Sequence, residues 1–138
     1  MRGILLAVLL TLSVNCSAET YLRLNGLSMH STAGNNALNY GAGLEHDLND
    51  TWSIAGGWYR NSEWHGSGYA YARYTVYQDD MWNVGIGAGL VTGYKTMSPL
   101  PMAIPDVCYG VLCALFAPKV QSTGSSVLGF SVRLPISQ

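Results

Sequence analysis

Charged residues are scarce in this chain of 138 residues, and their scarcity limits what the protein can be. Only 11% of the residues are charged, whereas about a quarter of a soluble domain usually is. Seven basic and eight acidic residues give a net charge of −1, which excludes a strongly basic protein that binds nucleic acid. Because 49% of the residues are hydrophobic, the chain is too apolar to stay disordered. The length predicts a single domain.

Long hydrophobic runs are also missing. A transmembrane helix needs about 20 apolar residues, and no segment of the chain reaches that length. A short apolar run over residues 4–14 follows Arg2 and precedes Ser17 and Ala18, a pattern typical of a secretory signal peptide. We therefore expect residues 1–18 to be a cleaved signal peptide and residues 19–138 to form the mature domain. The alternative is a lipoprotein signal in which Cys16 is acylated.

The mature chain instead shows alternation with a period of two residues, the pattern of half-buried strands. In the clearest case, Trp82, Val84 and Ile86 alternate with Asn83 and Gly85. Polarity separates less cleanly over residues 20–30, where Tyr21 and Met29 would share one face. Alternation and turn residues together predict eight strands, over residues 20–30, 38–47, 52–61, 67–77, 82–93, 102–109, 112–118 and 127–136.

Strands of this length are close to the 9–11 residues with which a tilted strand crosses a bilayer. An even strand number, an export signal and apolar residues alternating with small or polar ones favour an all-β fold, an eight-stranded antiparallel transmembrane up-and-down β-barrel of the bacterial outer membrane. A closed barrel satisfies every backbone group within lipid, and the aromatic residues would form girdles at its two interfaces. The alternative is a periplasmic sandwich or a lipocalin-like barrel, but one face of such a protein should carry many Lys and Glu residues.

The topology of such a barrel places residues at its two ends. Both termini and the short turns would be periplasmic, so the first and third strands would end outside the cell. His30, Asn61 and Ser62 would therefore gather at the outer rim, although they are scattered in the sequence. By alternation His30 shares a face with Gly26, and that face would point into the lumen. The external loops would include residues 31–36, 94–101 and 119–125.

Several short segments point to one family through their order and spacing. They are the segment around His30, residues 39–44, 59–64 and 85–92, and the prolines Pro99, Pro101, Pro105 and Pro118 with Tyr109 and Gly110 among them. Together these segments resemble the lipid A palmitoyltransferase (PagP) family, an eight-stranded outer-membrane barrel that holds an acyl chain in its lumen. The resemblance covers about residues 25–134. The chain departs from the family in lacking an amphipathic N-terminal helix and a C-terminal aromatic residue, and in having Asn61 where the family has a catalytic Asp.

The resemblance implies an acyltransferase that moves a fatty acyl chain from a phospholipid to a hydroxyl of lipid A. Such a reaction needs a base and donors for the oxyanion. His30 is the natural base, and Ser62 is either the nucleophile or an oxyanion donor. Asn61 cannot accept a proton as Asp would, but it can orient the imidazole or donate its amide. The alternative reading is that His30 is a solvated rim residue and that Asn61 and Ser62 are ordinary polar residues at the end of a strand.

Glycines and prolines are the candidate substrate-binding residues. Glycines that face the lumen would leave room for a hydrocarbon tail, or they would simply permit tight curvature of the barrel. Prolines cannot donate to a strand ladder, so they imply a local gap in its hydrogen bonding. The alternative is that the loop there is longer than the predicted residues 94–101. In the family such gaps are lateral doors for lipids. The candidates are Gly41, Gly43, Gly85, Gly87, Gly89, Pro101, Pro105 and Pro118.

The remaining expectations concern single residues and partners. Cys108 and Cys113 flank a two-residue turn and would lie opposite each other, although geometry decides whether they form a disulfide. Glu45 should point inward near the periplasmic end, paired with Arg23 or Arg73, since an unpaired buried carboxylate is costly. The histidines lack the spacing of metal ligands, and no cofactor is expected. The expected partners are membrane lipids, a phospholipid donor and a lipid A acceptor, and the chain is expected to be a monomer. The rival function is a non-catalytic structural or surface-interaction barrel.

Overall fold

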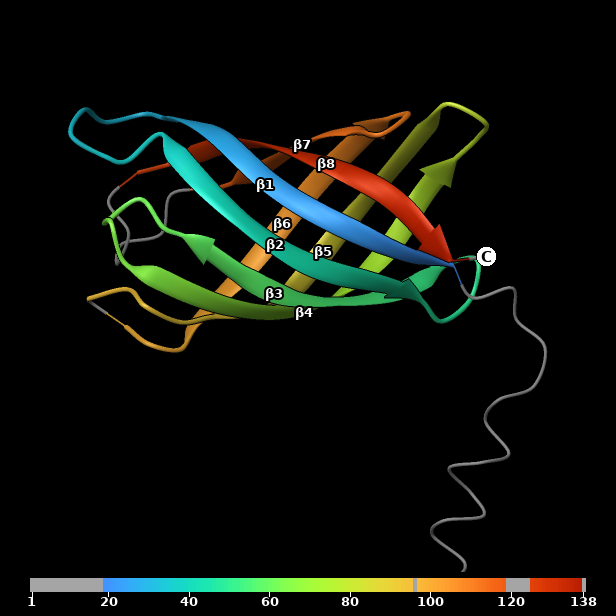
Figure 1. The fold of residues 1–138 in the computed structure, drawn as a ribbon, viewed down its shortest axis with the longest axis horizontal. Helices are drawn as coiled ribbons and strands as arrows, with labels where there is room; N and C mark the ends of the chain where they lie inside the picture. The colour runs from blue at the N-terminus through green and yellow to red at the C-terminus, as the bar shows by residue number, and fades with distance from the viewer. Residues whose placement is uncertain (1–18, 96, 119–124, 138) are drawn as a thin grey trace, which may run out of the picture.

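Eight antiparallel strands form one closed barrel in which each strand pairs with its neighbours in the sequence and β8 pairs with β1 (Figure 1). This computed structural model describes residues 19–95, 97–118 and 125–137, so the predicted signal peptide lies outside the described residues. No helix in these three ranges is long and apolar enough to cross a membrane. The strands are β1 Thr20–His30, β2 Leu38–Asp47, β3 Trp52–Arg60, β4 Gly66–Gln78, β5 Trp82–Val91, β6 Leu100–Tyr109, β7 Leu112–Ala117 and β8 Val127–Ser137.

The predicted all-β barrel of eight strands is confirmed, with differences at the strand ends. Strand β6 begins at Leu100, two residues before the predicted start, because Leu100 and Pro101 still pair with β5. Strand β7 ends at Ala117, and Pro118 lies just beyond it. The two ends of the barrel are distinct: the described chain both starts and finishes at the end that holds the short β2–β3 turn (Figure 1).

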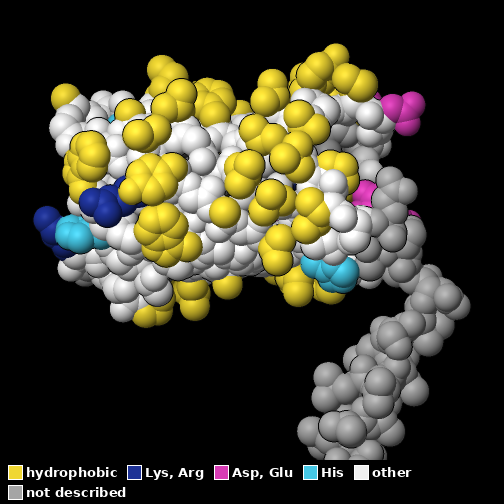
Figure 2. Space-filling view, viewed as in Figure 1, with side chains coloured by type: hydrophobic (Ala, Val, Ile, Leu, Met, Phe, Trp, Pro, Cys, Tyr) yellow, Lys and Arg dark blue, Asp and Glu magenta, His cyan; other side chains and the backbone are white. Residues whose placement is uncertain are grey.

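The outer face of the barrel is apolar. Along β5 the large side chains Trp82, Ile86 and Leu90 are exposed, whereas Gly85 and Gly87 between them are buried. Large apolar side chains are also exposed on the other strands, and hydrophobic side chains cover much of the face shown in Figure 2. The period of two in the sequence is therefore confirmed, and the large apolar residues point away from the lumen, opposite the glycines that were expected to face it.

A β-bulge in β1 reverses this alternation halfway along the strand. The pairing of β1 with both neighbours shifts after Asn25. Before the shift Tyr21 is buried, and after it Ser28 is buried while Met29 is exposed. The expectation that Tyr21 and Met29 share a face was wrong, because a bulge inserts one residue and flips every side chain that follows. This inserted residue also explains why polarity did not separate along this segment.

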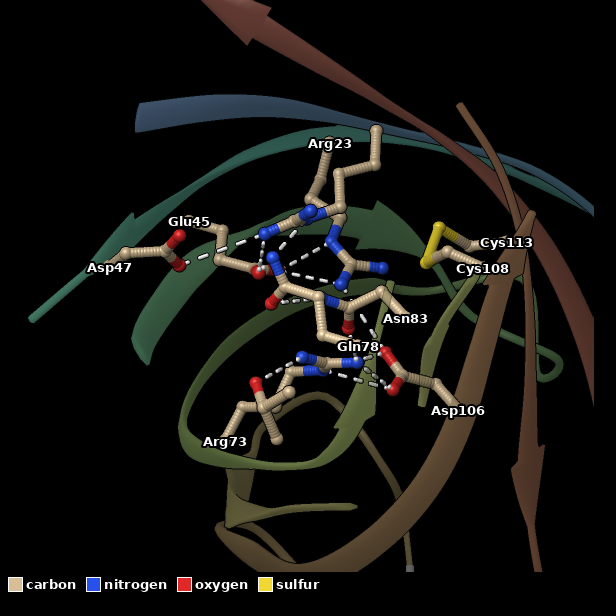
Figure 3. Close-up of a disulfide and its surroundings, with 11 residues drawn as sticks. Arg23, Glu45, Asp47, Arg73, Gln78, Asn83, Asp106, Cys108 and Cys113 are labelled. Atoms are coloured by element: carbon tan, nitrogen blue, oxygen red, sulfur yellow. Dashed lines mark hydrogen bonds and ion pairs between the residues drawn. A yellow bond between two sulfur atoms is a disulfide. The ribbon is translucent and has the colours of Figure 1, made fainter. Parts of the chain in front are cut away.

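The lumen near the chain termini is filled by a buried network of ion pairs (Figure 3). The Glu45 carboxylate accepts from Arg23 at 2.6 Å and from Arg133 at 2.9 Å, and Asp106 pairs with Arg73 at 2.7 Å. Arg23 also reaches Asp106 at 3.2 Å and so links the two groups. The predicted pairing of Glu45 with Arg23 is confirmed, whereas Arg73 pairs with Asp106 instead.

A disulfide joins Cys108 and Cys113 across the turn between β6 and β7. The two cysteines pair directly in the ladder, and Gly110 adopts a positive φ of 57° in the turn between them. A two-residue hairpin turn of this kind requires the left-handed conformation that glycine reaches without strain. The sequence alone did not decide whether this disulfide forms. The ladder register places the two cysteines directly opposite each other, which provides the close approach that the bond needs.

We expect replacement of both cysteines by serine to lower the free energy of unfolding by about 2 kcal/mol, because the bond closes only a short loop. Urea unfolding in lipid vesicles, followed by tryptophan fluorescence, measures the difference. A reductant should destabilise the natural protein by the same amount and leave the double variant unaffected. Equal destabilisation of both proteins by the reductant would contradict this assignment of the effect to the disulfide.

Candidate functional site

A cavity of about 480 Å³ occupies the lumen between the ion-pair network and the end of the barrel that holds His30 and Ser62. Its upper part is lined by His30, Ser62 and Tyr94, and its deepest part reaches Arg23. His30 and Arg23 are seven residues apart along β1, so the cavity extends over roughly 23 Å at about 3.3 Å per residue. Its size lies within the range of small-molecule sites. The apolar part of its wall comes from β5, β6, β7 and β8: Val91, Leu100, Ile104, Leu115, Val127 and Phe130.

The cavity extends to a gap between β6 and β7. The ladder between these strands contains four pairs, from Asp106–Leu115 to Tyr109–Leu112, so residues 100–105 have no partner on the β7 side among the residues that the structure describes. Residues on both faces of β6 line the cavity, since Leu100 is buried and Pro101 is exposed. Leu115 and Ala117 of β7 also line the cavity, so both strands that border the gap contribute to its wall.

The prolines of β6 lie at the positions that such a gap allows. Tyr109 pairs with Leu112 next to the turn, so alternate residues counted back from Tyr109 direct their backbone groups toward β7. Pro105 and Pro101 fall on this count, and a proline nitrogen has no hydrogen to donate. The predicted gap in hydrogen bonding is therefore present in the ladder. Pro101 and Pro118 line the cavity, whereas Pro105 does not.

His30 and Ser62 line the same cavity, as their predicted places at one rim require. His30 is the last residue of β1 and is half-buried. Ser62 follows β3 in the loop to β4, and its carbonyl accepts a hydrogen bond from the Asn36 amide at 2.9 Å. The loop that follows His30 is thus tied to the backbone of Ser62. The candidate base and the candidate nucleophile or oxyanion donor therefore border the same open space.

Asn61 does not line the cavity, and its side chain has another task. The amide nitrogen donates to Ser67 Oγ at 2.9 Å and to the Gly93 carbonyl at 2.8 Å. The amide oxygen accepts from the backbone nitrogens of Glu63 and His65, each at 2.9 Å. These four bonds use the full hydrogen-bonding capacity of an Asn side chain. Asn61 has none left to orient His30 or to bind an oxyanion, so it acts on the site by shaping the loop that carries Ser62.

We expect Asn61→Ala to lower the free energy of unfolding by about 1–3 kcal/mol, because it leaves buried groups without partners. Chemical denaturation of the refolded barrel measures this change. Asn35→Ala is the matched control, since the Asn35 amide bonds to Thr32 within the same exposed loop and to no other described residue. Equal stabilities of the two variants would contradict the structural role of Asn61.

The five candidate glycines do not line the cavity. Side chains from neighbouring strands fill the space that they leave: the Arg73 guanidinium lies against Gly85, and the Tyr71 ring lies against Gly87. The Tyr69 hydroxyl lies against Gly43 in the same way. Gly41 and Gly89 instead lie close to the backbone of the adjacent strand. The glycines thus let large neighbours cross the barrel, and the open space lies elsewhere in the lumen.

Four tyrosines shape the cavity and were missed as site residues in the sequence. The hydroxyls of Tyr59 and Tyr94 are hydrogen-bonded at 2.9 Å, and the Ser62 side chain also interacts with the Tyr94 hydroxyl. Burial raises the pKa of Tyr94 above its ordinary value, so this hydroxyl stays protonated and can donate. Tyr69 stacks against Tyr71 with ring centroids 5.9 Å apart. Their alternation in β4 indicated a strand, but it did not show which face was inward.

Comparison with known proteins does not assign the chain to a family: no family model matches it, and no curated protein is detectably similar to it.

Proposed function

We propose that this chain is an outer-membrane lipid acyltransferase similar to the PagP family, which moves a fatty acyl chain from a phospholipid to a hydroxyl of lipid A or a related lipid. The observation that carries the proposal is the lumen cavity, which joins His30 and Ser62 at the rim to a gap between β6 and β7. A chain in that cavity would have its ester group beside a candidate base and a candidate nucleophile.

The membrane location is supported by the outer face of the barrel. Exposed side chains such as Leu44, Ile54 and Leu90 form an apolar surface that water would not favour. Aromatic pairs lie toward both ends of this surface: Trp52 with Tyr74 near the termini, and Tyr40 with Trp58 near the loops. Such belts are typical of barrels whose aromatic residues sit at the two membrane interfaces.

The orientation is supported by the distribution of charge. Asp50, Asp79 and Asp80 are exposed in the short turns, whereas His65 and Lys95 are exposed in the loops at the other end. Figure 2 shows Lys and Arg side chains at one end of the barrel and Asp and Glu side chains at the other. Outer-membrane barrels have short periplasmic turns and longer external loops, so the basic end would face the outer leaflet and the phosphates of its lipids.

The reaction would be an ester exchange at the rim. His30 takes the proton from the attacking hydroxyl, whose oxygen bonds to the acyl carbonyl carbon. The bond from that carbon to the phospholipid oxygen then breaks, and the departing oxygen receives the proton from the imidazole. Ser62 is either the first attacking hydroxyl, through an acyl-enzyme, or a donor to the oxyanion. The same site would hydrolyse the phospholipid if water took the place of the acceptor.

Mass spectrometry of lipid A tests the proposal. Outer membranes from cells that carry the protein should contain lipid A with one added acyl mass, and membranes from cells without it should not. Heat-modifiable gel migration shows in parallel that the barrel is folded. Unchanged lipid A beside a folded barrel would overturn the proposal and favour a non-catalytic barrel.

A further inference from the structure

The floor of the lumen cavity is polar, although its walls are apolar. Arg23, Asn25, Tyr71 and Ser131 line its deep part. The Ser131 residue is only 6% exposed, and its buried hydroxyl has no hydrogen-bond partner among the residues that the structure describes. A buried hydroxyl without a partner is unfavourable. A saturated hydrocarbon end placed against it would leave it unsatisfied.

The charge of the floor decides what kind of polar group it can take. Three arginines in the network, Arg23, Arg73 and Arg133, are balanced by the three carboxylates of Glu45, Asp47 and Asp106. The Arg23 guanidinium already donates to Glu45 and Asp106. The floor therefore has no excess charge to bind a carboxylate or an ammonium group, and its free capacity is that of neutral hydroxyls.

We propose that the lumen cavity takes an acyl chain whose far end carries an uncharged polar group, such as a hydroxyl, which hydrogen-bonds to Ser131 in the floor that Tyr71 also lines. This inference rests on the proposed function in one respect, that a lipid chain occupies the lumen. It adds the chemistry of the chain end. The apolar residues of β6 and β7 cover the middle of the chain, and the deep polar residues select its end.

Equilibrium dialysis of fatty-acid probes into lipid nanodiscs that contain the folded protein tests the proposal. The probes are fatty acids of 10–16 carbons, each with and without a hydroxyl on the terminal carbon, and empty nanodiscs give the background. At the best chain length the natural protein should bind the hydroxylated probe roughly five- to tenfold more tightly than the plain one, the value of one recovered hydrogen bond. Ser131→Ala should abolish this preference, and Tyr71→Phe should reduce it.

Ser53→Ala is the matched control. Ser53 is also buried, at 2% exposure, and its hydroxyl likewise has no partner among the described residues, but it does not line the cavity. This variant should keep the full preference. Because preferences are compared between proteins, the unequal partitioning of the two probes into lipid cancels.

The outcomes separate this inference from the proposed function. A preference that survives Ser131→Ala, or equal binding of both probes by the natural protein, overturns the inference and leaves acyl transfer standing. Failure of every probe to bind above the empty nanodiscs overturns the inference together with a chain-filled lumen. Loss of the preference in Ser53→Ala as well would assign the effect to general packing and also overturn it.

Discussion

Replacement of Glu45 by glutamine is expected to lower the free energy of unfolding by about 3–5 kcal/mol, because it leaves two buried arginines facing a neutral amide. Glu45 is fully buried and accepts from both Arg23 and Arg133. Glutamine has nearly the same size, so the change removes charge without opening a cavity. Urea unfolding of the folded barrel in lipid vesicles measures the loss.

The matched control is Asp50→Asn, which also exchanges a carboxylate for its amide. Asp50 is exposed in the turn between β2 and β3, where water replaces any lost interaction. The free energy of unfolding of this variant should therefore hardly change. A Glu45→Gln protein as stable as this control would show that water reaches the lumen network and screens it. The same result would weaken the view that this network closes the barrel below the cavity.

The sequence was sufficient to predict the barrel, because its strongest signal is a backbone property. Side chains on a strand alternate between two faces, and Trp82, Ile86 and Leu90 alternate with glycines on β5 as expected. The turn residues then fixed the number of strands. The bulge in β1 could not be predicted this way, since an inserted residue depends on the pairing with both neighbours.

The candidate site was only partly predictable, for a similar reason. Topology alone placed His30 and Ser62 at one rim, and both line the cavity. Whether Gly87 leaves a space depends on Tyr71, which comes from the neighbouring strand. The partners of Asn61 include Gly93, 32 residues away in the sequence. Interactions of this kind require the register of the sheet, and local patterns do not contain it.

The gap between β6 and β7 connects the stability of the barrel with its proposed use. A closed barrel placed in lipid would have to pair its backbone groups, and the described part of this barrel leaves residues 100–105 unpaired on the β7 side. Prolines at positions 101 and 105 remove two of the donors that would otherwise lack partners. The disulfide between Cys108 and Cys113 covalently links the two strands where their ladder is short. The sequence thus limits the cost of an opening that a lipid chain would need.

The largest effect on the proposed activity is expected for His30→Ala, which should lower the rate of the proposed acyl transfer by about 10²–10⁴-fold, the usual contribution of a general base. The reason is geometric: His30 and Ser62 line the same cavity, and in the proposed reaction the imidazole takes the proton from the hydroxyl that attacks the ester there. The rate is measured as transfer of labelled acyl chain from phospholipid to lipid A in mixed vesicles.

His65→Ala is the control that separates this role from a general effect of losing a histidine near the loops. His65 is exposed, and it bonds to Asn61 through its backbone amide and its backbone carbonyl, both of which alanine preserves. The control should keep its activity, and both variants should retain heat-modifiable migration as folded barrels. A Ser62→Ala variant distinguishes the two roles proposed for Ser62. If Ser62 is an oxyanion donor, its loss should lower the rate by about 10²–10³-fold. If Ser62 is the nucleophile, the natural protein should yield a trapped acyl-enzyme and the variant should not. Equal activities of the His30 and His65 variants would mean that the base lies elsewhere in the rim.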